Sequence, residues 1–143
     1  MKNTILKDVM IYHPITVNID ENFSRVIEIF EQKDIRHLPI VNAAGVIMGI
    51  ISQRDFYRVT APKKNASGAY VYDMNALAKY MLKEHLISNV VTLCPEDSIE
   101  RAVELMAEQK VGCVPIVDKE NKVVGIVTAV DMLKLFLKML QQK

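Results

Sequence analysis

The sequence of 143 residues has no tryptophan, only two cysteines and no excess of charge of either sign. Its 18 Lys and Arg residues against 17 Asp and Glu residues give a formal net charge of +1. That balance removes the usual electrostatic basis for binding nucleic acid or a membrane surface. The longest strongly apolar runs are only of strand length, and the first residues contain no signal-peptide core. We therefore expect a cytoplasmic protein without a membrane span.

Motifs that would predict an enzyme or a metal site are also missing. Cys94 and Cys113 stand 19 residues apart, without a CxxC pair or paired histidines. A structural zinc site needs four ligands at defined spacings, so we expect two small buried or half-buried thiols instead. The sequence contains no HExxH pair, no nucleophile elbow and no GxxxxGK[ST] phosphate loop. We expect neither a catalytic site nor a bound metal.

An internal repeat organises the chain. Segment 37–42 (HLPIVN) matches segment 113–118 (CVPIVD), and segment 49–55 (GIISQRD) matches segment 125–131 (GIVTAVD), both at an offset of 76 residues. Upstream, the apolar positions 23, 26, 27 and 30 match positions 99, 102, 103 and 106 at the same offset. An offset held from about residue 11 to residue 55 indicates a tandem duplication.

Each copy predicts the element order β-α-β-β-α. Short strands at 15–19 and 90–93 precede helices whose apolar residues follow the i, i+3, i+4, i+7 rule, so one face, including Val103, should be buried. Buried strands at 38–41 and 114–117 each carry a proline, which fits an edge position. Turns at 42–45 and 118–121, with Gly45 and Asn121 able to adopt positive φ, lead into strands at 46–52 and 123–128 and a further helix.

The repeat predicts an α+β fold. One unit of roughly 55 residues leaves a face of its small sheet uncovered. We therefore expect the two repeats to pack sheet to sheet about a pseudo-twofold axis. The predicted boundaries place the first repeat at 1–59, an inserted loop and linker helix at 60–84, and the second repeat at 85–143.

Two segments fall outside the matched part of the repeat. Residues 61–68 predict an exposed loop with solvated Lys63 and Lys64, and Asp73 should cap a helix over residues 74–82 with an apolar side; the role of this insert stays open. The C-terminal helix, residues 129–142, is apolar nearly all round. This surplus favours a homodimer interface, although packing inside one chain is the alternative.

These repeats resemble a pair of CBS domains, together called a Bateman module. The resemblance rests on Asp8-Val9-Met10, on the LPIV and VPIV strands, and on the two Gly-h-h-[Ser/Thr]-x-x-Asp elements, where h is apolar. It covers nearly the whole chain except the insert, and we expect no other fused domain. The resemblance implies a stand-alone regulatory module, not an enzyme. Its regulatory ligand would be AMP, ADP, ATP or S-adenosylmethionine, held between the repeats, and it would signal to an unidentified partner protein by conformational change.

The resemblance also implies two composite ligand sites. The Asp carboxylate would accept hydrogen bonds from the ribose hydroxyls, and the Ser or Thr hydroxyl beside a helix N-terminus would donate to phosphate. One site would combine Thr128, Asp131, His13, Ile15, Arg36 and His37. The other would combine Ser52, Asp55, Asn89, Val91, Gly112 and Cys113, borrowing positive charge from Arg54 or Lys110. Because only the first has Arg36, we expect it to bind phosphate-bearing nucleotides more tightly.

Structural readings of the same residues stand beside these assignments. Asp55 and Asp131, with Ser52 and Thr128, could simply cap helices. His37 could be a half-buried histidine at a strand start, Arg36 a solvated charge and Cys113 a packing residue. The alternative function is then a structural dimerisation scaffold with vestigial nucleotide sites.

Overall fold

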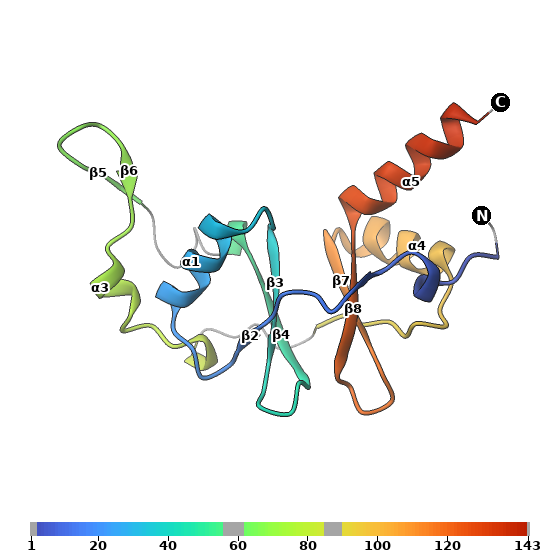
Figure 1. Cartoon of the computed structure of the whole chain (residues 1–143), viewed down its shortest axis with the longest axis horizontal. Coiled ribbons are helices and arrows are strands. Elements are labelled where there is room, and N and C mark those ends of the chain that lie inside the picture. The colour runs from blue at the N-terminus through green and yellow to red at the C-terminus, as the bar shows by residue number, and fades with distance from the viewer. Residues whose placement is uncertain (1–2, 56–61, 85–89, 143) are drawn as a thin grey trace. The chain divides into compact units, whose positions relative to one another are not determined.

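The structure is a computed structural model that describes residues 3–55, 62–84 and 90–142 (Figure 1). The chain forms two compact units, each with its own sheet and hydrophobic core. The second-repeat unit comprises Met1–Pro14, Gly45–Ile47 and Val91–Lys143, and the first-repeat unit comprises Ile15–Ala44 and Met48–Val90. The strand predicted at 15–19 is present as β2, whereas the strand predicted at 90–93 is reduced to a single bridge between Leu93 and Ile116. The α+β class and the duplication are confirmed.

The first-repeat unit is built on a three-stranded sheet in the order β2-β3-β4. Its elements are β2 (Val17–Asn18), α1 (Phe23–Gln32), β3 (His37–Val41) and β4 (Ile47–Ser52). Helix α1 begins after Asn22, whose side chain accepts a hydrogen bond from the Arg25 backbone N–H. Its apolar positions are buried as the spacing predicts, and they pack against the sheet as the centre of this core.

The second-repeat unit has a sheet in the order β1-β8-β7. Its elements are the 3-10 turn η1 (Leu6–Asp8), β1 (Ile11–Tyr12), α4 (Ile99–Gln109), β7 (Cys113–Val117), β8 (Val123–Thr128) and α5 (Ala129–Gln141). Strand β1 pairs antiparallel with β8, and Leu6, fully buried, lies in the same core as Val114. The N-terminal segment, placed by sequence in the repeat at 1–59, therefore packs with the second repeat.

Three local expectations from the sequence are wrong. Val103 is 44% exposed rather than buried, because it faces an open groove beside α5. Cys94 is exposed, whereas Cys113 is buried. Strand β3 is central, not an edge strand. It tolerates Pro39 because β2 pairs only with Ile40 and Val41, beyond the proline.

The turns agree with expectation. Gly45 and Asn121 adopt positive φ angles of 85° and 62°. The side chain of Asn42 accepts from the Ala44 backbone N–H, and that of Asp118 accepts from Glu120 and Lys122. These short polar side chains fix the two hairpin turns.

The insert is more structured than its sequence suggests. The expected loop is a small hairpin of β5 (Lys63–Lys64) and β6 (Tyr70–Val71), and both of its lysines are exposed. Asp73 caps α3 (Met74–Leu77) as predicted, accepting from two backbone N–H groups. The helix ends there instead of running to residue 82, because the chain turns to pair with the start of α1. The Tyr80 carbonyl accepts from Phe23, and the Glu21 carbonyl accepts from Leu82, which begins the 3-10 turn η2 (Leu82–Glu84).

Helix α5 differs from every other helix in how little of it is buried. Only Met132 is buried, although most of the helix is apolar. Figure 1 shows α5 leaving the end of β8 and running past α4. Within the described ranges, every helix is too short or too polar to cross a lipid bilayer.

Candidate functional site

The second repeat places Thr128 and Asp131 at the first turn of α5. The Thr128 Oγ1 atom accepts from the Asp131 backbone N–H at 3.1 Å and donates its proton to Asp131 Oδ2 at 2.8 Å. Both side chains are partly buried. Because one hydroxyl both accepts and donates within the motif, the pair already satisfies the free N–H of the helix start. The interpretation of Thr128 as a helix cap is therefore correct, and it does not exclude a second role in ligand binding.

The first repeat has the same pair at the helical turn that follows β4. The Asp55 backbone N–H donates to Ser52 Oγ at 3.1 Å, and the Ser52 backbone N–H donates to Asp55 Oδ2 at 3.0 Å. This is a reciprocal capping box with Asp in the position that Glu or Gln usually takes. Both motifs thus put a carboxylate and a hydroxyl side by side at a helix N-terminus, where the helix dipole favours an anion.

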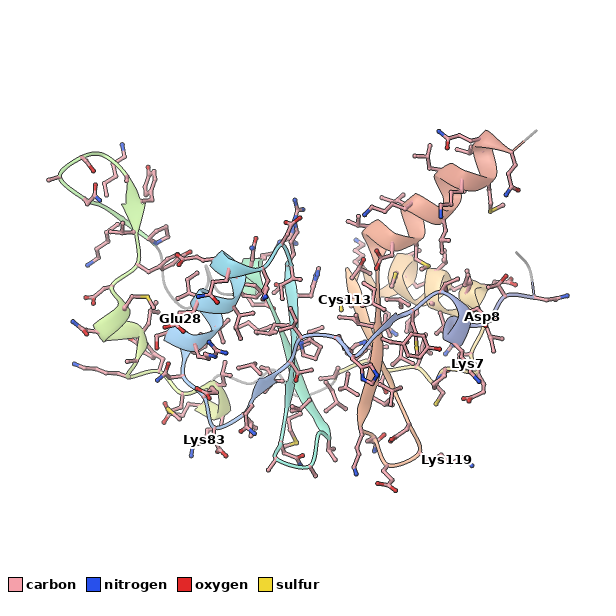
Figure 2. All side chains as sticks on the ribbon, viewed as in Figure 1. Lys7, Asp8, Glu28, Lys83, Cys113 and Lys119 are labelled. Carbon is pink, nitrogen blue, oxygen red and sulfur yellow. The ribbon has the colours of Figure 1, made fainter. Side chains whose placement is uncertain are left out.

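The strand start in the second repeat adjoins its own motif. The Gly112 carbonyl accepts from the Ala129 backbone N–H at 2.9 Å, and Cys113 lies opposite Thr128 in the β7–β8 pairing. Figure 2 shows Cys113 at the end of β7 nearest the start of α5. Burial, and then the negative charge of Asp131, raises the pKa of the Cys113 thiol far above its ordinary value. Cys113 is therefore a neutral packing thiol in this structure.

The first repeat has the equivalent arrangement with different side chains. The Arg36 carbonyl accepts from the Gln53 backbone N–H at 3.0 Å. Burial lowers the pKa of His37; the Asp55 carboxylate opposes this effect, and Arg36 adds to it. His37 is therefore a half-buried, mainly neutral imidazole beside Asp55, and Arg36 is exposed.

The structure thus brings predicted site residues together within each repeat. His37 and Arg36 lie with Ser52 and Asp55 in the first-repeat unit, and Gly112 and Cys113 lie with Thr128 and Asp131 in the second. The composite grouping, which combines residues of the two repeats, stays a prediction.

The remaining predicted residues are more scattered. His13 is exposed, belongs to the second-repeat unit and has a φ of 49°, a left-handed conformation that is costly for a residue other than glycine. Ile15 and Arg54 are exposed, and Val91 is half-buried. Asn89 lies outside the described residues. Among the described residues, no three His, Cys, Asp or Glu side chains lie together in a way that could hold a metal ion.

The motif glycine has a role that the sequence did not reveal. A Cβ atom on Gly125 would lie 2.6 Å from Met10 Sδ and 3.1 Å from the Ile11 carbonyl oxygen. Gly125 therefore admits the N-terminal segment to the surface of β8. Asp8-Val9-Met10 is one of the motifs that carry the family resemblance. Its contact with Gly125 could not be predicted from the sequence, because it depends on the antiparallel pairing of β1 with β8.

Two copies of one α+β repeat, each with a Ser/Thr-x-x-Asp pair at a helix start, define a tandem-repeat module. The chain belongs to the CBS domain family, whose model matches residues 6–61 and 82–138. The structure resembles the CBS domain pair of protein MJ0100 in complex with 5-methylthioadenosine and S-adenosyl-L-methionine. The TM-score is 0.78 at 28% identity, covering 95% of this chain and 98% of the other.

Two curated relatives show the family in different settings. A CBS domain-containing protein of Dictyostelium discoideum is 27% identical, with 96% of this chain and 94% of that protein covered. Homoserine O-acetyltransferase of Methanohalobium evestigatum is also 27% identical over 94% of this chain, but the chain spans only 24% of its length. The likeness to the second protein is thus confined to a part of it.

Proposed function

We propose that this chain is a noncatalytic regulatory module that binds an adenosine-containing ligand through residues of both repeats and transmits binding to a partner protein. The observation that carries the proposal is the pair of Ser/Thr-x-x-Asp helix starts, one in each repeat, in which the Asp backbone N–H donates to the Ser or Thr hydroxyl. Support comes from the 28% identical CBS pair whose structure contains two adenosine compounds. AMP, ADP, ATP and S-adenosylmethionine share the adenosine group and are the candidate ligands.

Each helix start offers what a ribose and a phosphate need. A carboxylate accepts hydrogen bonds from hydroxyl donors, and a helix N-terminus attracts phosphate oxygens. Binding has a cost here, because Thr128 Oγ1 already donates to Asp131 Oδ2. A ribose that occupies the carboxylate frees the Thr128 proton for a phosphate oxygen. The hydrogen bond inside the motif is thus exchanged for two hydrogen bonds to the ligand.

The signal requires two arrangements of the chain with different ligand affinity, because a ligand shifts an equilibrium only through such a difference. A ligand that contacts both repeats supplies it. We propose that Thr128, Asp131, His13, Ile15, Arg36 and His37 form the tighter site for phosphate-bearing nucleotides, and that Ser52, Asp55, Arg54, Asn89, Val91, Gly112 and Cys113 form the weaker one.

Calorimetric titration with AMP, ATP and S-adenosylmethionine tests this proposal. Asp131→Asn should weaken the tighter binding event by about tenfold or more, and Asp55→Asn should leave it nearly unchanged. Arg36→Gln, at an exposed position, should weaken AMP and ATP while sparing S-adenosylmethionine, which has no phosphate. Mass spectrometry of released ligand should recover the compound chemically unchanged. A larger loss from Asp55→Asn, or turnover of the ligand, would refute the assignment.

A scaffold function is the second candidate, and the capping hydrogen bonds favour it. If Ser52, Asp55, Thr128 and Asp131 serve only to begin helices, none of the four compounds should bind or raise the melting temperature. The asparagine variants would then lower stability without any effect on ligands.

A further inference from the structure

The hairpin turn of the first repeat is paired with the hairpin of the second repeat. Segment Gly45–Ile47 lies in the second-repeat unit, although its sequence belongs to the first repeat. There it meets residues 121–123, and Val46 pairs antiparallel with Lys122 as a β-bridge. The Lys122 ammonium forms an ion pair with Glu120, in its own turn, at 3.2 Å. The bridge is therefore a contact between backbones and does not depend on the lysine charge.

Two backbone hydrogen bonds flank this bridge, and the repeat relates them. The Ile47 N–H donates to the Asn121 carbonyl oxygen at 3.0 Å. The Val123 N–H donates to the Gly45 carbonyl oxygen at 3.1 Å. The repeat offset of 76 residues converts each bond into the other, because Ile47 matches Val123 and Gly45 matches Asn121. Each repeat thus gives one donor and one acceptor, so a displacement of either turn strains the same two bonds.

The bridge lies at the start of both strands that lead to the proposed ligand motifs. Strand β4 begins at Ile47 and ends at Ser52, and strand β8 begins at Val123 and ends at Thr128. Each is six residues long and is paired with a neighbouring strand of its own sheet. Rigid elements of this kind carry energetic coupling between distant sites. A ligand that displaces the end of one strand therefore acts, through the bridge, on the other strand.

We propose that this bridge couples the two proposed ligand sites, so that AMP in one site changes the affinity of the other. The inference rests on the proposed function and adds its regulation. Coupling between two sites is reciprocal, and the bridge is built from equivalent backbone atoms of both repeats. Ile47 and Val123 are positioning residues here, because they act only through β4 and β8. A second route exists within the second-repeat unit, where Cys113 lies opposite Thr128 in the β7–β8 pairing, and the experiment separates the two routes.

Calorimetric titration with AMP tests the coupling. The affinity of the weaker site is measured in the native chain, where the tighter site fills first, and in Thr128→Asp, which keeps a capping side chain but repels phosphate from the tighter site. The two values should differ by about fivefold or more. Added to both chains, Ile47→Pro removes one bridging N–H at the first residue of a strand, where proline is tolerated, and should reduce the difference to less than about twofold. Ile47→Ala, which keeps that N–H, and Lys122→Ala, which removes only the ion-pairing side chain, are the controls and should retain the difference.

Hydrogen exchange supplies a readout that needs no mutation, so it survives a proline variant that misfolds. The Ile47 and Val123 amides should change their exchange rates together as AMP fills the tighter site, because they donate the two bonds of one bridge. A bridge that only stabilises the turns would leave both rates unchanged, and that result would overturn the proposal. So would equal affinities in the native chain and Thr128→Asp, or a difference that survives Ile47→Pro, since the β7–β8 pairing would then carry the coupling. A native chain that binds none of AMP, ATP and S-adenosylmethionine would instead refute the proposed function, and this inference with it.

Discussion

The two repeats begin their last helices with nearly the same hydrogen bonds but surround them with different side chains. In the first repeat, Asp55 lies beside the half-buried imidazole of His37, with the Arg36 guanidinium close by in sequence. In the second repeat, Asp131 lies beside the buried neutral thiol of Cys113, and Gly112 stands at the position that matches Arg36. Both repeats have kept the hydrogen bond from the Asp backbone N–H to the Ser or Thr hydroxyl that starts the helix, whereas the charged side chains around it differ. A phosphate would therefore meet different fields at the two helix starts.

The comparison extends to what each repeat needs from outside its own sequence. The second repeat takes Leu6 and Met10 from the N-terminal segment into its core, and β1 pairs with β8. The first repeat takes Leu77 and Leu82 from the insert. Each repeat therefore completes its core with a segment from outside the repeat. The N-terminal segment completes the second repeat, and the insert completes the first repeat. Sequence similarity between repeats does not imply that their cores are closed in the same manner.

Truncating Leu6 should have the largest effect of the changes considered. Leu6→Ala removes a fully buried side chain, so we expect a loss of about 2–5 kcal/mol in the free energy of unfolding. Hydrogen exchange should report the loss in β7 and β8 rather than in β3 and β4. Leu38→Ala, at a fully buried position of the first-repeat core, is the control and should show the reverse pattern. Faster exchange in β3 and β4 of Leu6→Ala would contradict the division into units.

The repeat itself could be predicted from sequence because its causes are local. Helix α1 has an amphipathic period and a capping Asn22, and the hairpin turns depend on Gly45 and Asn121. Cores closed by distant segments could not be predicted, since nothing near Val103 distinguishes it from Ile27. The Ser/Thr-x-x-Asp pairs could also be predicted as motifs. The position of Cys113 opposite Thr128 could not, because it depends on how β7 pairs with β8.

Gly125 should give the next largest effect. Gly125→Ala adds a methyl group against Met10 and the Ile11 carbonyl, so we expect about 1–3 kcal/mol of destabilisation in denaturant unfolding. Part of this loss should disappear when it is measured in a Met10→Ala background, which removes the closer contact. An equal loss in both backgrounds would place the conflict elsewhere. Gly45→Ala offers a contrast, because only its φ of 85° opposes the methyl group there.

The two helix caps should respond alike if their shared geometry is what matters. Thr128→Val and Ser52→Ala each remove the hydroxyl that accepts from the Asp131 or Asp55 backbone N–H. We expect each change to cost about 1 kcal/mol in unfolding free energy. Thermal melts of both variants without ligand provide the measurement. A cost confined to one repeat would show that the matching hydrogen bonds do not have matching energetic roles.

The smallest effect, and the one that separates the repeats most cleanly, is the response to pH. The folded pKa of His37 lies below its ordinary value of 6.5, mainly because of burial, so the unfolded chain binds a proton first as the pH falls. The free energy of unfolding should therefore decrease as the pH falls from about 7 through 6.5 toward the lower folded pKa. His37→Asn should remove this part of the pH dependence, measured by denaturant unfolding at several pH values. His13→Asn, at an exposed position, is the control for a general histidine effect and should retain it. Cys113, the residue matching His37, keeps its proton throughout this range, because the ordinary pKa of a thiol already lies above 7 and burial raises the pKa of Cys113 further. The second repeat should therefore contribute nothing to the slope from this position, and a pH dependence that is unchanged in His37→Asn would show that the difference between the two strand starts has no energetic consequence.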